Sequence, residues 1–272
     1  MRRLIGLIVI AWFGFLSVFA QCAAENEAIQ PGEELVYELK FNWKFIWVKA
    51  GKAYMDVQAT TYKNKPAYNC SLLTVTNSTV DMFFKMRDTL TCITSQQLEP
   101  MYFKKAAEEG SRYTIDEVRF SYPNGQVQVS QVRKRSDRSP VFCSERRSEC
   151  VFDMLSILLR ARSFDVNDYK VGDKILFPMA TGTRIEEQTL IYRGKEVFKA
   201  EDDTRYRCLV FSLVEYDKKK REKEVITFFI TDDENHLPVR LDLYLNFGSA
   251  KAFLKSVKGN RHPLTSILKE ED

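Results

Sequence analysis

Residues 35–43 read LVYELKFNW, and apolar side chains occupy every second position of this stretch. Its odd positions are all aliphatic or aromatic, whereas Glu38, Lys40 and Asn42 stand between them. Successive side chains of a β-strand point to opposite faces, so this period of two predicts a strand with one face on a core and the other in solvent.

Alternating apolar residues recur along most of the chain after this stretch. Segments 67–75 and 86–94 fit a hairpin, and Asn124-Gly125 favours a tight turn because both residues tolerate positive φ. Residues 206–216 are apolar on both faces, which is typical of a central strand. Further strands are predicted at 53–59, 118–122, 127–132, 225–230, 239–247 and 252–257.

One segment departs from this pattern and predicts a helix. Asp153 is a preferred N-cap residue, because its carboxylate accepts the backbone N–H groups left free at a helix start. The residues after it, up to Ala161, place apolar side chains on one stripe, with Arg160 and Arg162 outside the stripe. Strands, one helix and then strands again indicate a mainly β protein whose antiparallel sheet is covered by one main α-helix.

Residues 1–20 have the features of a signal peptide. Arg2 and Arg3 precede an apolar run, and Ala20 fits the small-residue rule for cleavage, as does Ala24. The run is shorter than the ~20 apolar residues of a spanning helix, which disfavours a membrane anchor. We therefore expect an exported, periplasmic protein whose mature chain has no transmembrane segment.

A lipid-modified Cys22 is a third interpretation of the N-terminus. Gln21 fits it poorly, since lipoprotein signals have a small residue before the cysteine. Beyond the export segment, we expect a single β-rich domain over residues 30–258 and a loose polar tail over 259–272.

Charge and motif content disfavour several classes of function. The formal net charge is +4, and Arg2 and Arg3 of the export segment contribute to it, so nucleic acid is not an expected partner of the mature chain. We find no P-loop, dinucleotide fingerprint or G-x-S-x-G elbow. With only His236 and His262 as histidines, a catalytic triad or a metal site is not expected either. The sequence therefore predicts a non-catalytic protein without a cofactor.

Several short motifs, in a fixed order, resemble the domain of unknown function 3108 family. They cover the opening strands, the central helix, the strand after it and the closing turn, and they span residues 30–258. The matching segments are GEELVY at 32–37, KAGKA at 49–53, DMLS at 153–156 with Arg162, VGD at 171–173, ITDD at 230–233, LPV at 237–239 and Gly248.

The resemblance implies an exported bacterial protein with a fold similar to the half-barrel of lipoprotein-localisation factors. In that fold a curved antiparallel sheet wraps partly around a helix. The family implies no established activity. This sequence departs from the family where Leu159 stands in place of a usual aromatic residue, and its cysteines are not carried over from the family.

The aromatic opening strand is the first candidate for a ligand site. Tyr37, Phe41, Trp43 and Trp47 would line an apolar cavity for a lipid-like molecule on the concave face of a half-barrel. The simpler interpretation is that these rings pack on the helix, because alternating aromatic residues are usually core.

Ser156 and Arg162, together with Asp153, are the second candidate, a polar ligand site near the helix start. In the simpler interpretation Asp153 and Ser156 belong to a helix cap, and Arg162 pairs with a carboxylate at the surface.

Export would place the six cysteines where disulfides can form. In the hairpin of 67–75 and 86–94, Cys70 stands opposite Cys92, so we expect these two to be neighbours, bonded or not. Cys143 and Cys150 flank a short polar loop and are candidates to close it, and Cys208 is expected to be a buried free thiol.

These features support two main hypotheses of function. The first is a periplasmic protein that binds or carries a hydrophobic or amphipathic, lipid-like ligand on the concave face, and it requires open apolar surface there. The second is a non-catalytic structural or interaction protein of the cell envelope, which holds a partner through sheet edges or residues 133–147 and has a filled concave face. An unrecognised hydrolase would require polar groups that converge in a pocket.

Overall fold

The computed structural model describes residues 22–43, 46–245 and 248–269, without the side chain of Trp43. The predicted signal peptide lies outside the described residues. Two α-helices, two 3-10 helices and fifteen strands are present in the described part: α1 (Ser78–Asp81), α2 (Met154–Ala161), η1 (Pro123–Gly125), η2 (Val166–Asp168), β1 (Glu33–Trp43), β2 (Ile46–Tyr62), β3 (Lys65–Thr76), β4 (Met86–Ser95), β5 (Pro100–Glu109), β6 (Arg112–Ser121), β7 (Val127–Arg135), β8 (Arg138–Arg147), β9 (Lys174–Ala180), β10 (Ile185–Lys199), β11 (Arg205–Tyr216), β12 (Glu222–Thr231), β13 (Pro238–Leu245), β14 (Gly248–Lys258) and β15 (Ile267–Leu268).

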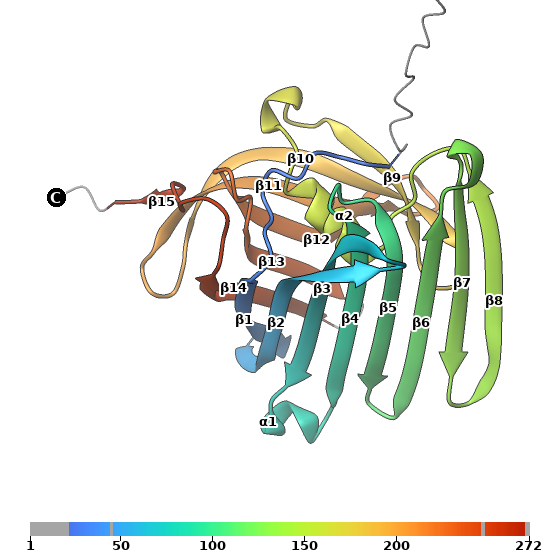
Figure 1. Cartoon of the computed structure of the whole chain (residues 1–272). Helices are drawn as coiled ribbons and strands as arrows, with labels where there is room; N and C mark the ends of the chain where they lie inside the picture. Colours follow the sequence, from blue (N-terminus) through green and yellow to red (C-terminus); the bar gives the residue numbers. More distant parts are fainter. Residues whose placement is uncertain (1–21, 44–45, 246–247, 270–272) are drawn as a thin grey trace, which may run out of the picture.

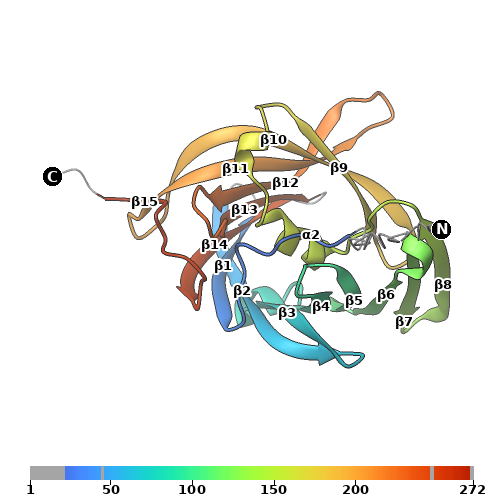
Figure 2. The ribbon, with the colours of Figure 1, turned by 45° about the horizontal axis from the view of Figure 1, so that its top comes forward.

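All these strands belong to one antiparallel sheet (Figure 1). Its order is β8-β7-β6-β5-β4-β3-β2-β1-β14-β13-β12-β11-β10-β9, with β15 paired to β11. The sheet has two arms that meet at the pair β1–β14, and it curls around α2 (Figure 2). The edge strands β8 and β9 do not pair with each other, so the barrel stays open. The predicted mainly β half-barrel around one main helix is therefore confirmed.

The local signals of the sequence correspond to real elements. The hairpin of β3 and β4 has the predicted register, with Leu72 opposite Leu90, and the short α1 fills its turn. Asn124 and Gly125 adopt φ values of 54° and 74° between β6 and β7, as the turn requires. β11 pairs on both sides and is buried on both faces, which confirms a central strand.

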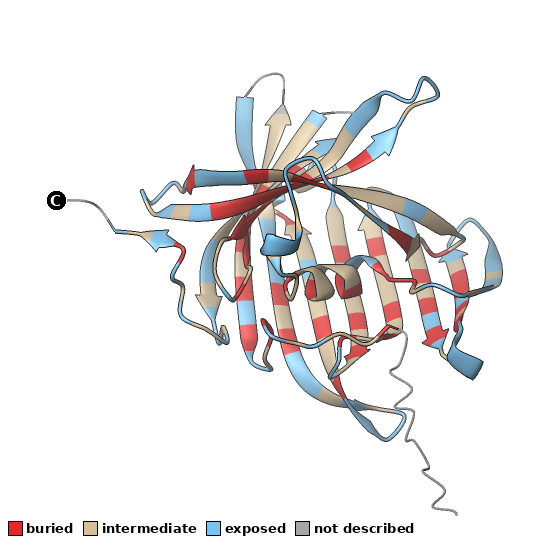
Figure 3. Cartoon of the chain, turned by 90° about the horizontal axis from the view of Figure 1, so that it is seen from above, coloured by how far each residue is buried: buried red, intermediate tan, exposed pale blue. Residues whose placement is uncertain are grey.

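The helix α2 divides the inner face of the sheet into two regions. We call inner the face that carries Leu35 and Leu90, which join Leu155 and Leu159 of α2 in the main hydrophobic core. Buried residues gather where the strands pass α2, and exposed residues become frequent toward the strand ends (Figure 3). Among the described helices, none has both the length and the apolar character needed to cross a bilayer.

The segment after residue 258, expected to be a loose tail, is packed onto the sheet over its described part. Asn235 Nδ2 donates to the carbonyl of His262 (2.8 Å), and the Ser266 hydroxyl donates to Asp233 (2.6 Å). The strand β15 then adds to β11. The polar turn after β12 binds the backbone of this segment, which composition alone does not reveal.

Candidate functional site

A buried hydrogen-bond network fixes the start of α2. Asp153 Oδ1 accepts the N–H groups of Leu155 (3.0 Å) and Ser156 (2.9 Å), and the Ser156 hydroxyl accepts the Asp153 N–H (2.9 Å). Burial raises the pKa of Asp153 to about 6, although these hydrogen bonds act in the opposite direction. Ser156 thus completes a reciprocal capping box in the core.

Arg162 is part of the same interior and is 1% exposed. Its guanidinium donates to both carboxylate oxygens of Glu33 (2.5 and 2.8 Å) and to the carbonyl of Asn235 (3.0 Å). The expectation of a surface partner is wrong, because Glu33, at the start of β1, is also buried. A buried charge of this kind requires a paired charge and further hydrogen bonds, and Arg162 has both, since Glu33 and two backbone carbonyls accept from its guanidinium.

The three aromatic candidates whose side chains are described do not form one cavity. Tyr37 is buried in the core, where its hydroxyl donates to the carbonyl of Pro238 (3.0 Å), and burial raises its pKa. Phe41 is half-buried on the inner face, farther from α2. Trp47 pairs with Asn42 after a register shift in β2, so it lies on the outer face. The side chain of Trp43 lies outside the described residues.

Beyond α2, one arm of the sheet presents an apolar wall on its inner face. Directly paired residues share a face, so the register from β1 through β14 to β9 defines one continuous row. Its large side chains are all half-buried, which leaves apolar surface open inside the half-barrel. This apolar wall consists of Phe41, Leu243, Ile226, Leu213, Leu190 and Ile175.

The other arm presents a polar row on the same inner face. Successive pairs from β3 to β8 place Thr74, Asp88, Ala107, Thr114, Arg135 and Arg138 side by side. The row begins with a hydroxyl and a carboxyl group and ends with two guanidinium groups. The open half of the inner face is therefore apolar on one arm and polar on the other.

The two arms approach each other where the barrel fails to close. The Gly182 N–H donates to Gln131 Oε1 (2.9 Å), and Arg133 donates to the carbonyl of Thr181 (2.7 Å). Gly182 has a φ of +91°, and a Cβ there would lie 2.5 Å from Cγ of Asp116. Hydrogen bonds from side chains of β7 to the β9–β10 turn therefore connect the two arms, in place of a pairing between strands. The close approach of Asp116 and the positive φ of residue 182 require a glycine at that position.

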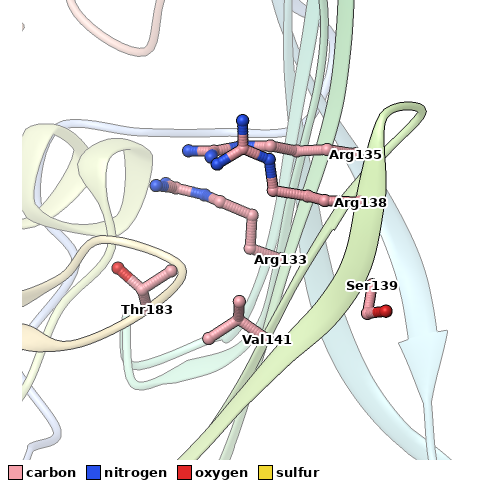
Figure 4. Close-up of a pocket in the computed structure, with 6 residues that line it drawn as sticks. All are labelled: Arg133, Arg135, Arg138, Ser139, Val141 and Thr183. Carbon is pink, nitrogen blue, oxygen red and sulfur yellow. The ribbon is translucent and has the colours of Figure 1, made fainter.

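A cationic notch of about 190 Å³ lies beside this contact (Figure 4). Arg133, Arg135 and Arg138 line it, and their guanidinium groups point to the same side of the β7–β8 hairpin. Val141 and Thr183 complete the main walls.

The three arginines of the notch differ in how far their charge is compensated. Arg133 forms a bidentate pair with Asp116 (2.6 and 2.7 Å), which raises the pKa of Arg133. Arg138 binds the exposed Asp137 (3.0 Å), and Arg135 has no ion-pair partner among the described residues. Arg135 and Arg138 are also directly opposite in register, where like charges repel. The notch keeps an uncompensated positive charge that suits an anionic group.

Sequence reasoning treated residues 133–147 only as a surface that could hold a partner, and it missed the notch. The signal was present, because residues two apart on a strand share a face, and a two-residue turn places Arg138 opposite Arg135.

Asp88 is an ionisable group near the β3 end of the polar row. Burial raises its pKa to about 6, and Lys105, with its Nζ 3.8 Å away, opposes this shift. Its Oδ1 is buried without a hydrogen-bond partner in the described part of the chain. The inner face therefore holds a carboxyl group that is poorly compensated when ionised.

The cysteines pair differently from the expectation. Cys22 forms a disulfide with Cys150, with the Cα atoms 5.3 Å apart. The proposed bond from Cys143 to Cys150 is wrong, because the expected loop is mostly the extended strand β8, which separates the two residues.

Cys70 and Cys92 are opposite each other in register, as expected, and both are buried free thiols. Burial raises the pKa of each thiol, and Cys208 is also a buried free thiol. The side chain of Cys143 is free and partly exposed. These thiols are therefore core side chains, with Cys143 as the exception.

Both histidines bind backbone carbonyls. His236 Nδ1 donates to the carbonyl of Arg162 (2.6 Å), and His262 Nε2 donates to the carbonyl of Glu27 (2.7 Å). Within the described ranges, no cluster of three or more His, Cys, Asp or Glu side chains is placed to hold a metal ion.

Comparison with known proteins gives the fold and the family. A crystal structure of a beta-barrel-like protein of domain of unknown function DUF1849 from Brucella abortus is similar, with a TM-score of 0.52 and 7% identity over 83% of this chain and 96% of that chain. At this identity the likeness concerns the fold alone. No curated protein matches the chain. The model of the family described as "Protein of unknown function (DUF3108)" matches residues 36–255, so the chain belongs to the DUF3108 family.

Proposed function

We propose that this protein binds and carries an anionic, lipid-like amphipathic molecule in the open half of its half-barrel. The observation that carries the proposal is the division of the inner face beyond α2 into an apolar wall and a polar row that ends at the cationic notch. An amphipathic anion has the two complementary surfaces in one molecule.

The apolar part of the ligand lies against the apolar wall. Leu243, Ile226 and Leu213 are half-buried there, so each keeps part of its apolar surface exposed. Each methylene group removed from water contributes about 0.8 kcal/mol, so a chain of several carbons is enough for stable binding.

The anionic group of the ligand lies at the cationic notch. Arg135 and Arg138 can donate several N–H groups to a phosphate or carboxylate, and they are the notch arginines without a buried carboxylate partner. Binding an anion there also relieves the repulsion between the two opposed guanidinium groups.

We further infer that the carrier works outside the cytoplasm, in the periplasm. The signal-peptide pattern of residues 1–20 supports this, and so does the Cys22–Cys150 disulfide, because disulfides persist in oxidising compartments. The disulfide also uses the Cys22 sulfur atom that a lipid anchor would need. Intact mass spectrometry of the mature protein should give a chain that starts at Gln21 with Cys22 oxidised, and a lipid-modified Cys22 would contradict this inference.

Native mass spectrometry of the mature protein from a bacterial envelope, followed by lipid extraction, tests the carrier. We expect a bound anionic amphipathic molecule that is lost in Leu243→Glu. The matched control is Leu73→Glu, because Leu73 is exposed on the outer face of β3. A protein without bound small molecules but with a stable protein partner would overturn the carrier and favour an envelope interaction through the exposed edge strand β8.

A further inference from the structure

The end of the sheet remote from α2 exposes large apolar side chains at the ends of β2 and β13 and in the β3–β4 connection. The register places the ends of β1–β2, β3–β4 and β13–β14 at this end, and the strand order makes them adjacent. α1, in the β3–β4 connection, lies at the lower end of the sheet in Figure 1. We call these side chains the apolar tips: Ile46, Trp47, Val48, Met82, Phe83, Phe84 and Leu245.

The exposure of the apolar tips is high for residues of this kind. Phe83 is 80% exposed, Met82 73% and Ile46 66%. The segments 46–48, 82–84 and 243–245 contain no charged residue. Single exposed apolar residues need no explanation, but a group at one end of a molecule marks a surface that contacts another apolar phase.

Basic residues flank the apolar tips on both sides of the sheet. The β11–β12 connection lies next to the β13–β14 end and carries Lys218, Lys219 and Lys220, which are exposed and have no carboxylate partner among the described residues. On the other arm, the β7–β8 hairpin carries the uncompensated Arg135. The surface is therefore apolar in its middle and cationic at its margins.

We propose that this end of the molecule docks onto the surface of an anionic lipid bilayer. Aromatic and aliphatic tips match the region between head groups and acyl chains, and the ammonium group of Lys251 over the Trp47 ring (4.8 Å to its centroid) is a pairing suited to that depth. Lysines at the margin are attracted to anionic head groups. The inference goes beyond the proposed function, since a carrier need not contact a bilayer directly.

Flotation of the mature chain with vesicles tests the docking. We expect binding to vesicles of equimolar phosphatidylglycerol and phosphatidylcholine and much weaker binding to phosphatidylcholine alone. Phe83→Glu should lower the partition coefficient at least about tenfold. Phe142→Glu should leave it unchanged, because Phe142 is equally exposed (76%) but lies on the edge strand β8. Circular dichroism of both variants shows that they are folded.

The lysines provide a second, electrostatic test. Replacing Lys218, Lys219 and Lys220 by Gln should weaken binding to the anionic vesicles about fivefold for each lysine, with no change for neutral vesicles. In Trp43→Phe, Trp47 is the only tryptophan left in the mature chain, and its emission should shift to the blue on docking.

Failure of the docking and failure of the carrier are distinguishable. A chain that floats with neither kind of vesicle overturns the docking even when it retains a bound ligand. Equal binding of Phe83→Glu and the unsubstituted chain overturns it as well. A chain that docks but never retains an amphipathic molecule overturns the proposed function alone. If the chain does not bind vesicles but holds a stable protein partner that Phe83→Glu releases, the docking is overturned and the apolar tips form a protein interface.

Discussion

The two halves of the inner face use the same strands and the same alternation of side chains, but they differ in what covers them. Around α2 the face is filled by the helix, by the segment of residues 22–30 and by the buried pair of Arg162 and Glu33. Beyond α2 the rows continue, yet their apolar members remain half-buried and their polar members end at the cationic notch. One half of the inner face is therefore a filled core, and the other half, where we propose that the ligand binds, keeps apolar and cationic surface exposed.

The largest expected effect is a loss of folding stability when the buried ion pair in the filled half, the part of the inner face around α2, is removed. Glu33→Gln leaves the Arg162 guanidinium buried without a charged partner, so we expect a loss of about 3–5 kcal/mol in the free energy of unfolding. Chemical denaturation measures it. The control is Arg184→Ala, which removes an exposed pair with Glu186 and should cost less than about 1 kcal/mol. Equal costs for both variants would show that the buried pair does not hold the filled half together.

The next effect concerns the disulfide that ties residue 22 to the region before α2. Cys22→Ser opens a loop with a sequence separation of 128 residues, and we expect a loss of about 2–4 kcal/mol. A reducing agent should destabilise the unsubstituted chain by a similar amount and leave the variant unchanged. Cys143→Ser is the control, because the Cys143 thiol is free and partly exposed. A reductant effect that persists in Cys22→Ser would contradict the assigned pairing.

A smaller, pH-dependent effect belongs to the open half. The fold raises the pKa of Asp88 to about 6, so ionised Asp88 destabilises the folded state above that pH, and the cost disappears as the pH falls toward the ordinary value of about 4. Asp88→Asn should therefore stabilise the protein by roughly 1 kcal/mol at pH 8, after allowance for solvent and Lys105, and have no effect near pH 4. Thermal melts of the variant and the unsubstituted chain at both pH values measure the change in stability. A stabilisation of the same size at pH 4 and pH 8 would show that it does not come from the ionisation of Asp88.

The smallest effect separates binding from stability in the notch. Arg135→Gln removes the repulsion with Arg138, and we expect a gain of about 0.5 kcal/mol at low salt that vanishes at high salt. The same variant should bind an anionic amphipathic ligand more weakly. Titration with a fluorescent fatty acid and with its neutral alcohol analogue measures this loss. If both compounds bind the variant unchanged, the notch is not the site of the anionic group.

The filled half could be predicted from the sequence in its local features. The alternation at 35–43, the Asn124-Gly125 turn and the Asp153 cap are each decided by a few neighbouring residues, and all of them appear in the structure. The pairing of Arg162 with Glu33 could not be predicted, because it joins residues 129 positions apart through the folded core.

The open half was only partly predictable. Register shifts after Leu39 and after Arg133 change which residues share a face, and they move Trp47 outward and place Val141 opposite Arg133. Alternation in the sequence does not reveal such shifts. The Cys22–Cys150 disulfide could not be predicted either, because it joins residues 128 positions apart that only the complete fold brings together.

Hydrogen exchange of the mature protein, with and without an anionic lipid-like amphiphile, tests the division of the inner face most directly. We expect the ligand to slow exchange in the open half, at residues 39–43, 241–245 and 133–138, and to leave α2 and residues 22–30 unchanged. Protection centred on α2, or no protection at any of these segments, would contradict the assignment of binding to the open half.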